Sequence, residues 1–313
     1  MKQMQSSMAK PNLFVRLGGD IKRNPYIYLM LIPVLAFYIL FCYKPMYGII
    51  IAFKDFSPRR GIIGSPWAGL DYFIQFFSSP YFWRTLRNTI VINVYSLLFS
   101  FPAPIILALL LNELKNGIFK RTVQTITYLP HFISLVVIVG ILKTLFSHNG
   151  VFTDILVFFG MDRFSIVTYP QFFRALYIGS DIWQGVGWGT IIYLAAISGI
   201  DSELYEAAKV DGASRLRRAF SITLPGIMPT VIILLILRIG SMMSLGHEKI
   251  ILLYNPNTYE TADVISSYVY RVGIEQGSFS YSAAVGLFNS VINFILVIGT
   301  NAFSKRVSET SLW

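Results

Sequence analysis

The sequence predicts an all-α membrane protein with six transmembrane helices and both termini in the cytoplasm. Three observations support this fold class. Of the 313 residues, 54% are hydrophobic and only 13% are charged, which is about half the charged fraction of a soluble domain. The hydrophobic residues are gathered in long blocks. Most Lys and Arg residues lie in the segments between those blocks, which is how membrane topology is encoded.

A transmembrane helix needs about 20 mostly apolar residues. The six segments closest to this standard are 26–43, 88–111, 122–146, 172–200, 226–245 and 283–303. The first follows a basic tail but lacks the small-residue cleavage site of a signal peptide, so it is interpreted as an uncleaved anchor. Residues 62–77 are apolar but are interrupted by Gly and Pro, which favours an extracellular loop with a short interfacial helix. The transmembrane domain is therefore 26–303, between cytoplasmic tails 1–25 and 304–313.

The distribution of Lys and Arg sets the orientation. With the N-terminus inside, the inner segments hold 14 basic residues in 65 positions, whereas the outer segments hold 9 in 106. The basic density is thus about two and a half times higher inside, as the positive-inside rule requires. The outer segment 44–87 departs from this trend because it contains six of the nine outer basic residues.

Several function classes are excluded or disfavoured by the residues present. The single cysteine, Cys42, rules out a disulfide framework within the chain, and the three histidines are too far apart in sequence to form a metal motif. Neither HExxH nor GxSxG occurs, which argues against an intramembrane enzyme. The net charge of +10 could indicate nucleic-acid binding. The basic residues lie beside the apolar blocks, however, which indicates that their partner is membrane lipid and not nucleic acid.

The predicted inner loop 201–225 is unusually long and structured. Ser202 is a suitable N-cap, and the acidic residues after it match the helix dipole. Asp211-Gly212 is a turn dipeptide that ends the first short helix, and a second helical stretch is expected over 213–220. Pro225 is placed to open the fifth span. Composition alone is equally consistent with an amphipathic interfacial helix pair that has no protein partner.

The spacing within this loop is more specific. Glu206-Ala207-Ala208, three residues, Gly212, nine residues and then Ile222-x-Leu224-Pro225 closely resembles the signature loop of binding-protein-dependent ABC importer permeases. The early anchor with Pro33, the Tyr128-Leu-Pro130 sequence and the number of spans also resemble the carbohydrate-type members, particularly those that import oligosaccharides or polysaccharide fragments. The resemblance implies a type I ABC importer fold, with a cytoplasmic coupling helix between the fourth and fifth spans.

The family resemblance also implies partners. Such permeases usually form half of a heterodimer with a second, homologous permease subunit. Two cytoplasmic ATP-binding subunits and an extracytoplasmic solute-binding protein complete the importer, in the bacterial plasma membrane. This chain has no GxxxxGK[ST] phosphate loop, so ATP and Mg are expected on the partner ATPase and no cofactor or metal in this chain. The residues expected to contact the ATPase are Glu206, Ala207, Ala208, Asp211, Gly212, Leu224 and Pro225.

The fourth span contains the sequence from Asp181 to Gly189, with three glycines in five positions. Two interpretations are open: close helix packing through small residues, or a locally loosened helix that lines a water-filled cavity. In the second case Trp183 and Trp188 would face sugar rings and Gln184 would bind hydroxyls. In the resembling family this span and the next one line the substrate site. The expected pathway residues are Asp181, Trp183, Gln184, Gly185, Trp188, Arg238, Ser241 and Asn289.

Two charged residues, Asp181 and Arg238, fall near the middle of their spans at 1.5 Å per residue. An unpaired charge at this depth is costly, so they should face each other or a wet cavity. A pair would make the site neutral, whereas Arg238 alone could bind a glycan carboxylate. The sequence thus indicates a non-catalytic permease subunit of a sugar importer. The alternative is a self-contained secondary transporter or channel for small polar solutes, which would show inverted repeats or paired broken helices; none is visible.

Overall fold

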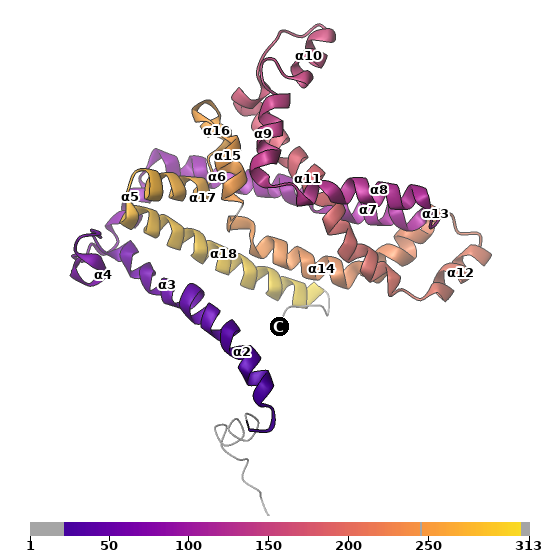
Figure 1. Cartoon of the computed structure of the whole chain (residues 1–313), viewed down its shortest axis with the longest axis horizontal. Helices are drawn as coiled ribbons and strands as arrows, with labels where there is room; N and C mark the ends of the chain where they lie inside the picture. The colour runs from indigo at the N-terminus through magenta and orange to yellow at the C-terminus, as the bar shows by residue number, and fades with distance from the viewer. Residues whose placement is uncertain (1–21, 245, 308–313) are drawn as a thin grey trace, which may run out of the picture.

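The computed structural model describes residues 22–244 and 246–307, and most of the two predicted cytoplasmic tails lies outside this range. The regular structure of the described chain consists of helices joined by loops, and its only β contact is an isolated bridge between Lys54 and Trp67. The predicted all-α fold class is therefore confirmed for these residues. Figure 1 shows an elongated helical body from which three parts project. They are α2 (Pro25–Phe37), the arm formed by α9 (Leu135–Leu145) and α10 (Val151–Phe158), and the end formed by α12 (Ser202–Val210) and α13 (Arg215–Arg218).

Four helices in the described chain are long and apolar enough to cross a membrane: Pro25–Phe53, Pro80–Glu113, Arg215–Gly240 and Phe279–Arg306. They match the first, second, fifth and sixth predicted spans. Each is longer than its prediction because the helix continues into flanking residues, but the fifth ends at Gly240 and not at the predicted 245. The second begins at Pro80 because Ser79 caps it, its hydroxyl accepting a hydrogen bond from the Tyr81 amide at 3.2 Å.

The third predicted span, 122–146, is wrong as a single straight helix. It is divided into α8 (Ile118–Tyr128), the short turn η4 (Leu129–Phe132) and α9 (Leu135–Leu145), and the two parts are bent by 101°. Pro130 in the turn cannot donate the backbone hydrogen bond that a continuing helix needs. Ser134 then starts α9 as its N-cap. If the bent pair is one span, the number of membrane helices rises to five.

The fourth predicted span corresponds to α11 (Pro170–Ser198), a continuous helix of 29 residues and therefore about 43 Å long. It is long enough to cross a bilayer, but it is not among the helices apolar enough to qualify. Asp181, Gln184 and the glycine-rich segment lower its hydropathy. Six spans are therefore not established by length and composition alone.

Three of the long helices contain a π-helical turn that ends two residues before a proline. These turns are η1 (Tyr38–Tyr43), η3 (Ser96–Ser100) and η6 (Ala219–Thr223), and the prolines are Pro45, Pro102 and Pro225. A proline removes one backbone donor, and its ring crowds the carbonyl four residues earlier. The wider π turn relieves this clash while the helix continues. Pro225 therefore lies within the Arg215–Gly240 helix, as the second residue of α14 (Leu224–Gly240), and does not begin the whole span.

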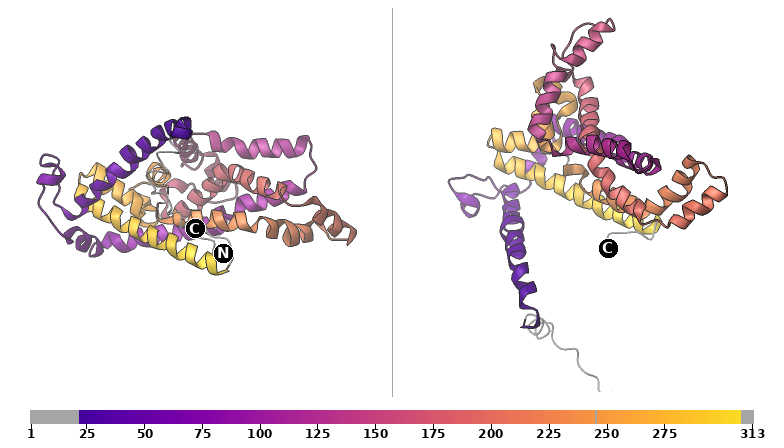
Figure 2. Two further views of the ribbon diagram at one scale, coloured as in Figure 1. Left: turned by 90° about the horizontal axis from the view of Figure 1, so that it is seen from below. Right: turned by 45° about the vertical axis from the view of Figure 1, so that its right-hand side comes forward.

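Helix α11 organises the core. Its second half packs against α7 (Pro102–Glu113) and α14 through a buried cluster that includes Ile105, Tyr193 and Ile227. Its first half packs against α9 and α15 through a separate cluster. The last helix, α18 (Phe279–Val307), lies beside α14, as both Figure 1 and Figure 2 show.

The remaining helices are α6 (Pro80–Tyr95), α3 (Lys44–Met46), α4 (Gly61–Gly64), α5 (Asp71–Phe77), α10 (Val151–Phe158), α12 (Ser202–Val210), α13 (Arg215–Arg218), α15 (His247–Leu253), α16 (Tyr259–Ala262) and α17 (Ile265–Tyr270).

The first membrane helix is separated from this body. Helix α2 (Pro25–Phe37) has no buried residue in the described chain, and its large apolar side chains are exposed on all sides. Figure 2 shows it extending away from the other helices. Contact with the body begins only at its far end, where η2 (Tyr47–Phe53) packs against α18.

Candidate functional site

The loop between α11 and α14 folds into two short helices, α12 and α13. Helix α12 begins after Asp201, whose carboxylate accepts a hydrogen bond from the Glu203 amide at 2.9 Å. The sequence placed the N-cap at Ser202, one residue too late, because both side chains suit the position. Gly212 turns the chain with φ +74°, a left-handed conformation that glycine adopts without strain. The second helix is shorter than the expected 213–220: α13 ends at Arg218 and continues as a π turn.

Side-chain contacts fix this loop to the body. The Tyr205 hydroxyl hydrogen-bonds the Thr223 hydroxyl at 2.9 Å, which joins α12 to the π turn that precedes α14. Arg218 donates to the Ala213 carbonyl at 3.0 Å and lies 3.7 Å from the Glu113 carboxylate at the end of α7. The loop is therefore a braced projection and not a free connection.

The motif residues lie on the outside of this projection. In the described chain α12 has no buried residue, and Glu206, Ala207, Asp211 and Gly212 are exposed while Ala208 is half-buried. Leu224 is half-buried and Pro225 exposed at the base of the loop. Two apolar side chains beside the motif are strongly exposed: Val210 at 89% and Leu216 at 70%. The projection therefore presents both apolar and acidic side chains to solvent.

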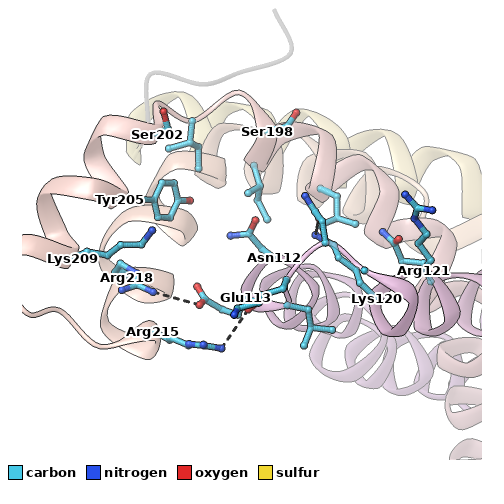
Figure 3. A pocket seen from close by; sticks show the side chains of 18 residues that line it. Asn112, Glu113, Lys120, Arg121, Ser198, Ser202, Tyr205, Lys209, Arg215 and Arg218 are labelled. Carbon is cyan, nitrogen blue, oxygen red and sulfur yellow. Dashed lines mark hydrogen bonds and ion pairs between the residues drawn. The ribbon is translucent and has the colours of Figure 1, made fainter.

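A cavity of about 870 Å³ lies behind the same loop, between α12 and the connection from α7 to α8. Figure 3 shows Lys209, Arg215 and Arg218 facing Lys120 and Arg121 across it, with Glu113 between them. Arg215 also approaches the Glu113 carbonyl. The sequence identified these basic residues as a topology signal and did not predict that they would line one cavity.

The second candidate site is a charged cavity of about 240 Å³ beside the middle of α11. The Asp181 carboxylate lies 3.9 Å from the Arg238 guanidinium and 3.9 Å from the Lys249 ammonium. Arg238 also donates a short hydrogen bond to the Ser96 hydroxyl. The structure therefore brings together Asp181 and Arg238, which is one of the two arrangements that the depth argument allowed. It adds a second cation, Lys249, that the sequence reasoning missed. Gln184 and Ser241 line the same cavity.

Lys249 comes from α15, a short helix outside the candidate membrane spans. Burial lowers the pKa of Lys249 to about 8, although Asp181 opposes this shift. The only sequence signal was a single Lys before four consecutive apolar residues. Its partner Asp181 is 68 positions away in the chain, so the contact depends on the tertiary fold and has no local pattern.

A third cavity, of about 450 Å³, shares Asp181, Arg238 and Ser241 with the charged one. It extends along α11 past Gly185 towards the contact with α7. Five of the expected pathway residues, Asp181, Gln184, Gly185, Arg238 and Ser241, therefore surround two adjoining cavities.

The other three expected pathway residues lie elsewhere. Trp183 faces a separate apolar cavity with Leu142 and Phe172. Trp188 stacks on His131, with ring centroids 4.5 Å apart and planes inclined by 3°. Asn289 donates to the Met243 carbonyl at 2.8 Å and so fixes the turn η7 (Met242–Ser244), which follows α14, against α18.

The glycine-rich segment is an unbroken part of α11, so the local loosening that one of the two interpretations required is absent there. A Cβ on Gly187 would collide with the Thr127 carbonyl of α8, and a Cβ on Gly189 would lie 2.9 Å from the Pro104 ring of α7. These two glycines permit close helix packing. A Cβ on Gly185 would meet nothing within 4 Å, because this residue faces the cavity.

Comparison with known proteins gives a consistent result. Residues 100–309 match the family described as "Binding-protein-dependent transport system inner membrane component". The chain is 46% identical to Protein LplB of Bacillus subtilis over 94% of this chain and 92% of that protein. It is also 46% identical to the polygalacturonan/rhamnogalacturonan transport system permease protein YteP of the same organism, over 95% and 93%. A chain in the crystal structure of a bacterial alginate ABC transporter, in complex with an alginate pentasaccharide-bound periplasmic protein, has a TM-score of 0.87 and 44% identity, over 95% of this chain and 100% of that one.

Proposed function

The chain belongs to the family of binding-protein-dependent transport system inner membrane components, and from this premise we propose that it is one permease subunit of an ATP-driven importer for oligosaccharides or complex glycan fragments. The resemblance inferred from the inner-loop motif is confirmed by the family match and by similarity over almost the whole chain. The carbohydrate substrate follows from the relatives, whose names include a polygalacturonan permease and an alginate transporter.

The proposed topology has six crossings, with both termini in the cytoplasm of a bacterial cell. Four crossings are the long apolar helices, the bent α8–α9 pair is a fifth, and α11 is the sixth. Helix α11 crosses despite its lower hydropathy because Asp181, Gln184 and Gly185 face cavities instead of lipid. The higher density of basic residues in the proposed inner segments supports this orientation.

The observation that carries the proposal is the braced α12 helix with its exposed motif. Because the helix is fixed at its base and uncovered elsewhere, a partner that binds it can move the attached ends of α11 and α14. We assign that partner as a cytoplasmic ATP-binding subunit that holds ATP and Mg. Hydrolysis then takes place on the partner, and this chain transmits the conformational change to the membrane helices.

A second permease subunit is supported by the exposed first helix. In lipid, helices associate by van der Waals packing and hydrogen bonds, and a helix that reaches away from its own bundle is available to pack against another. Helix α2 together with η1 has this geometry. The complete importer would therefore contain two permease subunits, two ATP-binding subunits and an extracytoplasmic solute-binding protein that delivers the glycan.

The proposal is tested by replacing Gly212 with Val. Its φ of +74° is strained for any L side chain, and such a conformation costs about 1–2 kcal/mol, so the turn after α12 should be displaced. The expected result is normal membrane insertion with loss of ATPase association and of glycan uptake. The matched control is Gly160→Val, which places the same residue at φ +85° in the proposed outer segment. Co-purification of the ATPase with the Gly212 variant, together with normal uptake, would contradict the proposal.

A further inference from the structure

The charged cavity contains one cation more than its acid can neutralise. Asp181 is the one acidic residue that lines it, while Arg238 and Lys249 both lie 3.9 Å from the Asp181 carboxylate. The described residues therefore give the cavity a net charge of +1. The other polar side chains in its wall include Asn93, Gln184 and Ser241, which are neutral.

Lys249 is a buried cation whose hydrogen bonds this arrangement leaves unmade. The residue is only 5% exposed, and its ammonium nitrogen has no hydrogen-bond partner among the described residues. The ammonium lies 5.1 Å from the centroid of the Tyr177 ring and 3.9 Å from the Asp181 carboxylate, which is beyond hydrogen-bonding distance. Leaving a buried ammonium without hydrogen bonds is costly. A ligand that supplies an acceptor oxygen would remove this cost.

The position of Lys249 suits a ligand that passes along the adjoining cavities. The charged cavity and the larger 450 Å³ cavity share Asp181, Arg238 and Ser241. A glycan in the larger cavity therefore meets the charged wall from one side. Arg238 is exposed over 41% of its side chain, so it remains accessible to a ligand while Lys249 lies deeper.

On the basis of the proposed function, we infer that this cavity binds the carboxylate of a uronate residue between Arg238 and Lys249, and that it selects acidic over neutral glycans. Charge-assisted hydrogen bonds to a carboxylate are stronger than those to a sugar hydroxyl. Asp181 limits the attraction by competing for both cations. This limit suits a transport pathway, in which binding must be weak enough for the ligand to leave.

The test uses the complete importer, reconstituted in liposomes with its solute-binding protein. Uptake is measured for tetrasaccharides of galacturonate and of mannuronate and for the same glycans with their carboxylates reduced to alcohols, which are neutral. A further substrate is an anionic tetrasaccharide that carries sulfate groups and no carboxylate. Lys249→Met should lower uptake of the acidic glycans by about tenfold or more, as expected for loss of a hydrogen bond to a charged group. Lys249→Arg should restore most of this uptake. Lys143→Met removes an exposed Lys from α9 and is the matched control, with less than a twofold effect.

Each outcome decides between the hypotheses. The carboxylate site is supported if Lys249→Met loses uptake of acidic glycans and Lys249→Arg recovers it. Any neutral glycan that is transported should change little in either variant. Normal acidic-glycan uptake in Lys249→Met, or an equal loss for neutral and acidic glycans, overturns it. Wild-type uptake of only neutral or only sulfated glycans also overturns it, while the proposed function stands. If the wild type takes up no glycan at all, the proposed function itself fails.

Discussion

The buried carboxylate of Asp263 connects helices that are far apart in the sequence. Asp263 has 0% exposure and accepts hydrogen bonds from both terminal nitrogens of Arg271, at 3.0 and 2.6 Å. It also accepts from Arg84 of α6 at 3.1 Å and from the Ser267 hydroxyl at 2.9 Å. One carboxylate therefore fixes two guanidinium groups from separate helical segments at the proposed outer end of the bundle.

Replacing Asp263 with Asn keeps the shape of the side chain and removes the charge. Arg271, whose side chain is 12% exposed, would then lack a carboxylate partner, while Arg84, at 31%, keeps partial contact with solvent. Breaking a buried pair by removing one partner costs about 3–5 kcal/mol. Because Arg84 is partly solvated, we expect a loss near the lower limit, about 3 kcal/mol. Such a loss is a large fraction of the stability of a typical domain.

The assay is unfolding of the purified importer in detergent, followed by loss of the monodisperse complex as temperature rises. The matched control is Asp154→Asn, which breaks the exposed pair between Asp154 and Arg163, with side chains 57% and 37% exposed. An exposed pair contributes at most about 1 kcal/mol, so the control should unfold close to the wild type. Equal unfolding temperatures for the two variants would refute the assignment of Asp263 as the residue that fixes this end.

The remaining predictions concern packing, pH dependence and topology. Gly187→Ala should destabilise the importer by about 1–3 kcal/mol, as overpacking does. Gly179→Ala should not, because nothing lies within 4 Å of its added Cβ. Thermal unfolding of the two variants tests this difference. Burial lowers the pKa of Lys249 to about 8, so its positive charge is lost as pH rises through that value and acidic-glycan uptake should fall there. Uptake should persist in Lys249→Arg, because a guanidinium stays protonated over this pH range. Uptake at a series of pH values tests this, and parallel profiles would count against it. In a Cys42→Ser background, a cysteine at Ser165 should react with an impermeant thiol reagent only from outside and one at Asn116 only from inside; reaction from the opposite side would reverse the proposed orientation.

The long apolar helices and the inner-loop turn could be predicted from local sequence. The run 283–303 corresponds to the core of α18, and Gly212 has the positive φ that its turn dipeptide indicated. These features depend on composition and backbone preference within a few residues. The bend at Pro130 was missed because the prediction relied on the high hydropathy of 122–146 and gave little weight to a single proline. In the structure Pro130 and the Ser134 N-cap divide the helix.

The candidate site could be predicted only in part, because its geometry depends on long-range contacts. The depth of Asp181 and Arg238 within their helices predicted that they face each other or a wet cavity, and in the structure they lie 3.9 Å apart beside a cavity. The position of Lys249 against them could not be predicted, since it depends on how α15 folds back onto α11. The stacking of Trp188 on His131 has the same origin, with 57 positions between the two rings. An aromatic residue within a span gives no indication of which neighbour it contacts.

The most direct measurement is cross-linking of α12 to its partner. A photoreactive amino acid is placed at Ala207 in the assembled importer and irradiated, with Gly160 of the proposed outer segment as the matched position. Both residues are exposed in the isolated chain. We expect the residue at position 207 to form an adduct with the ATP-binding subunit and the residue at position 160 to form none with that subunit. Absence of an ATPase adduct from position 207, or its appearance only from position 160, would contradict the assignment of α12 as the element that couples this permease to ATP hydrolysis.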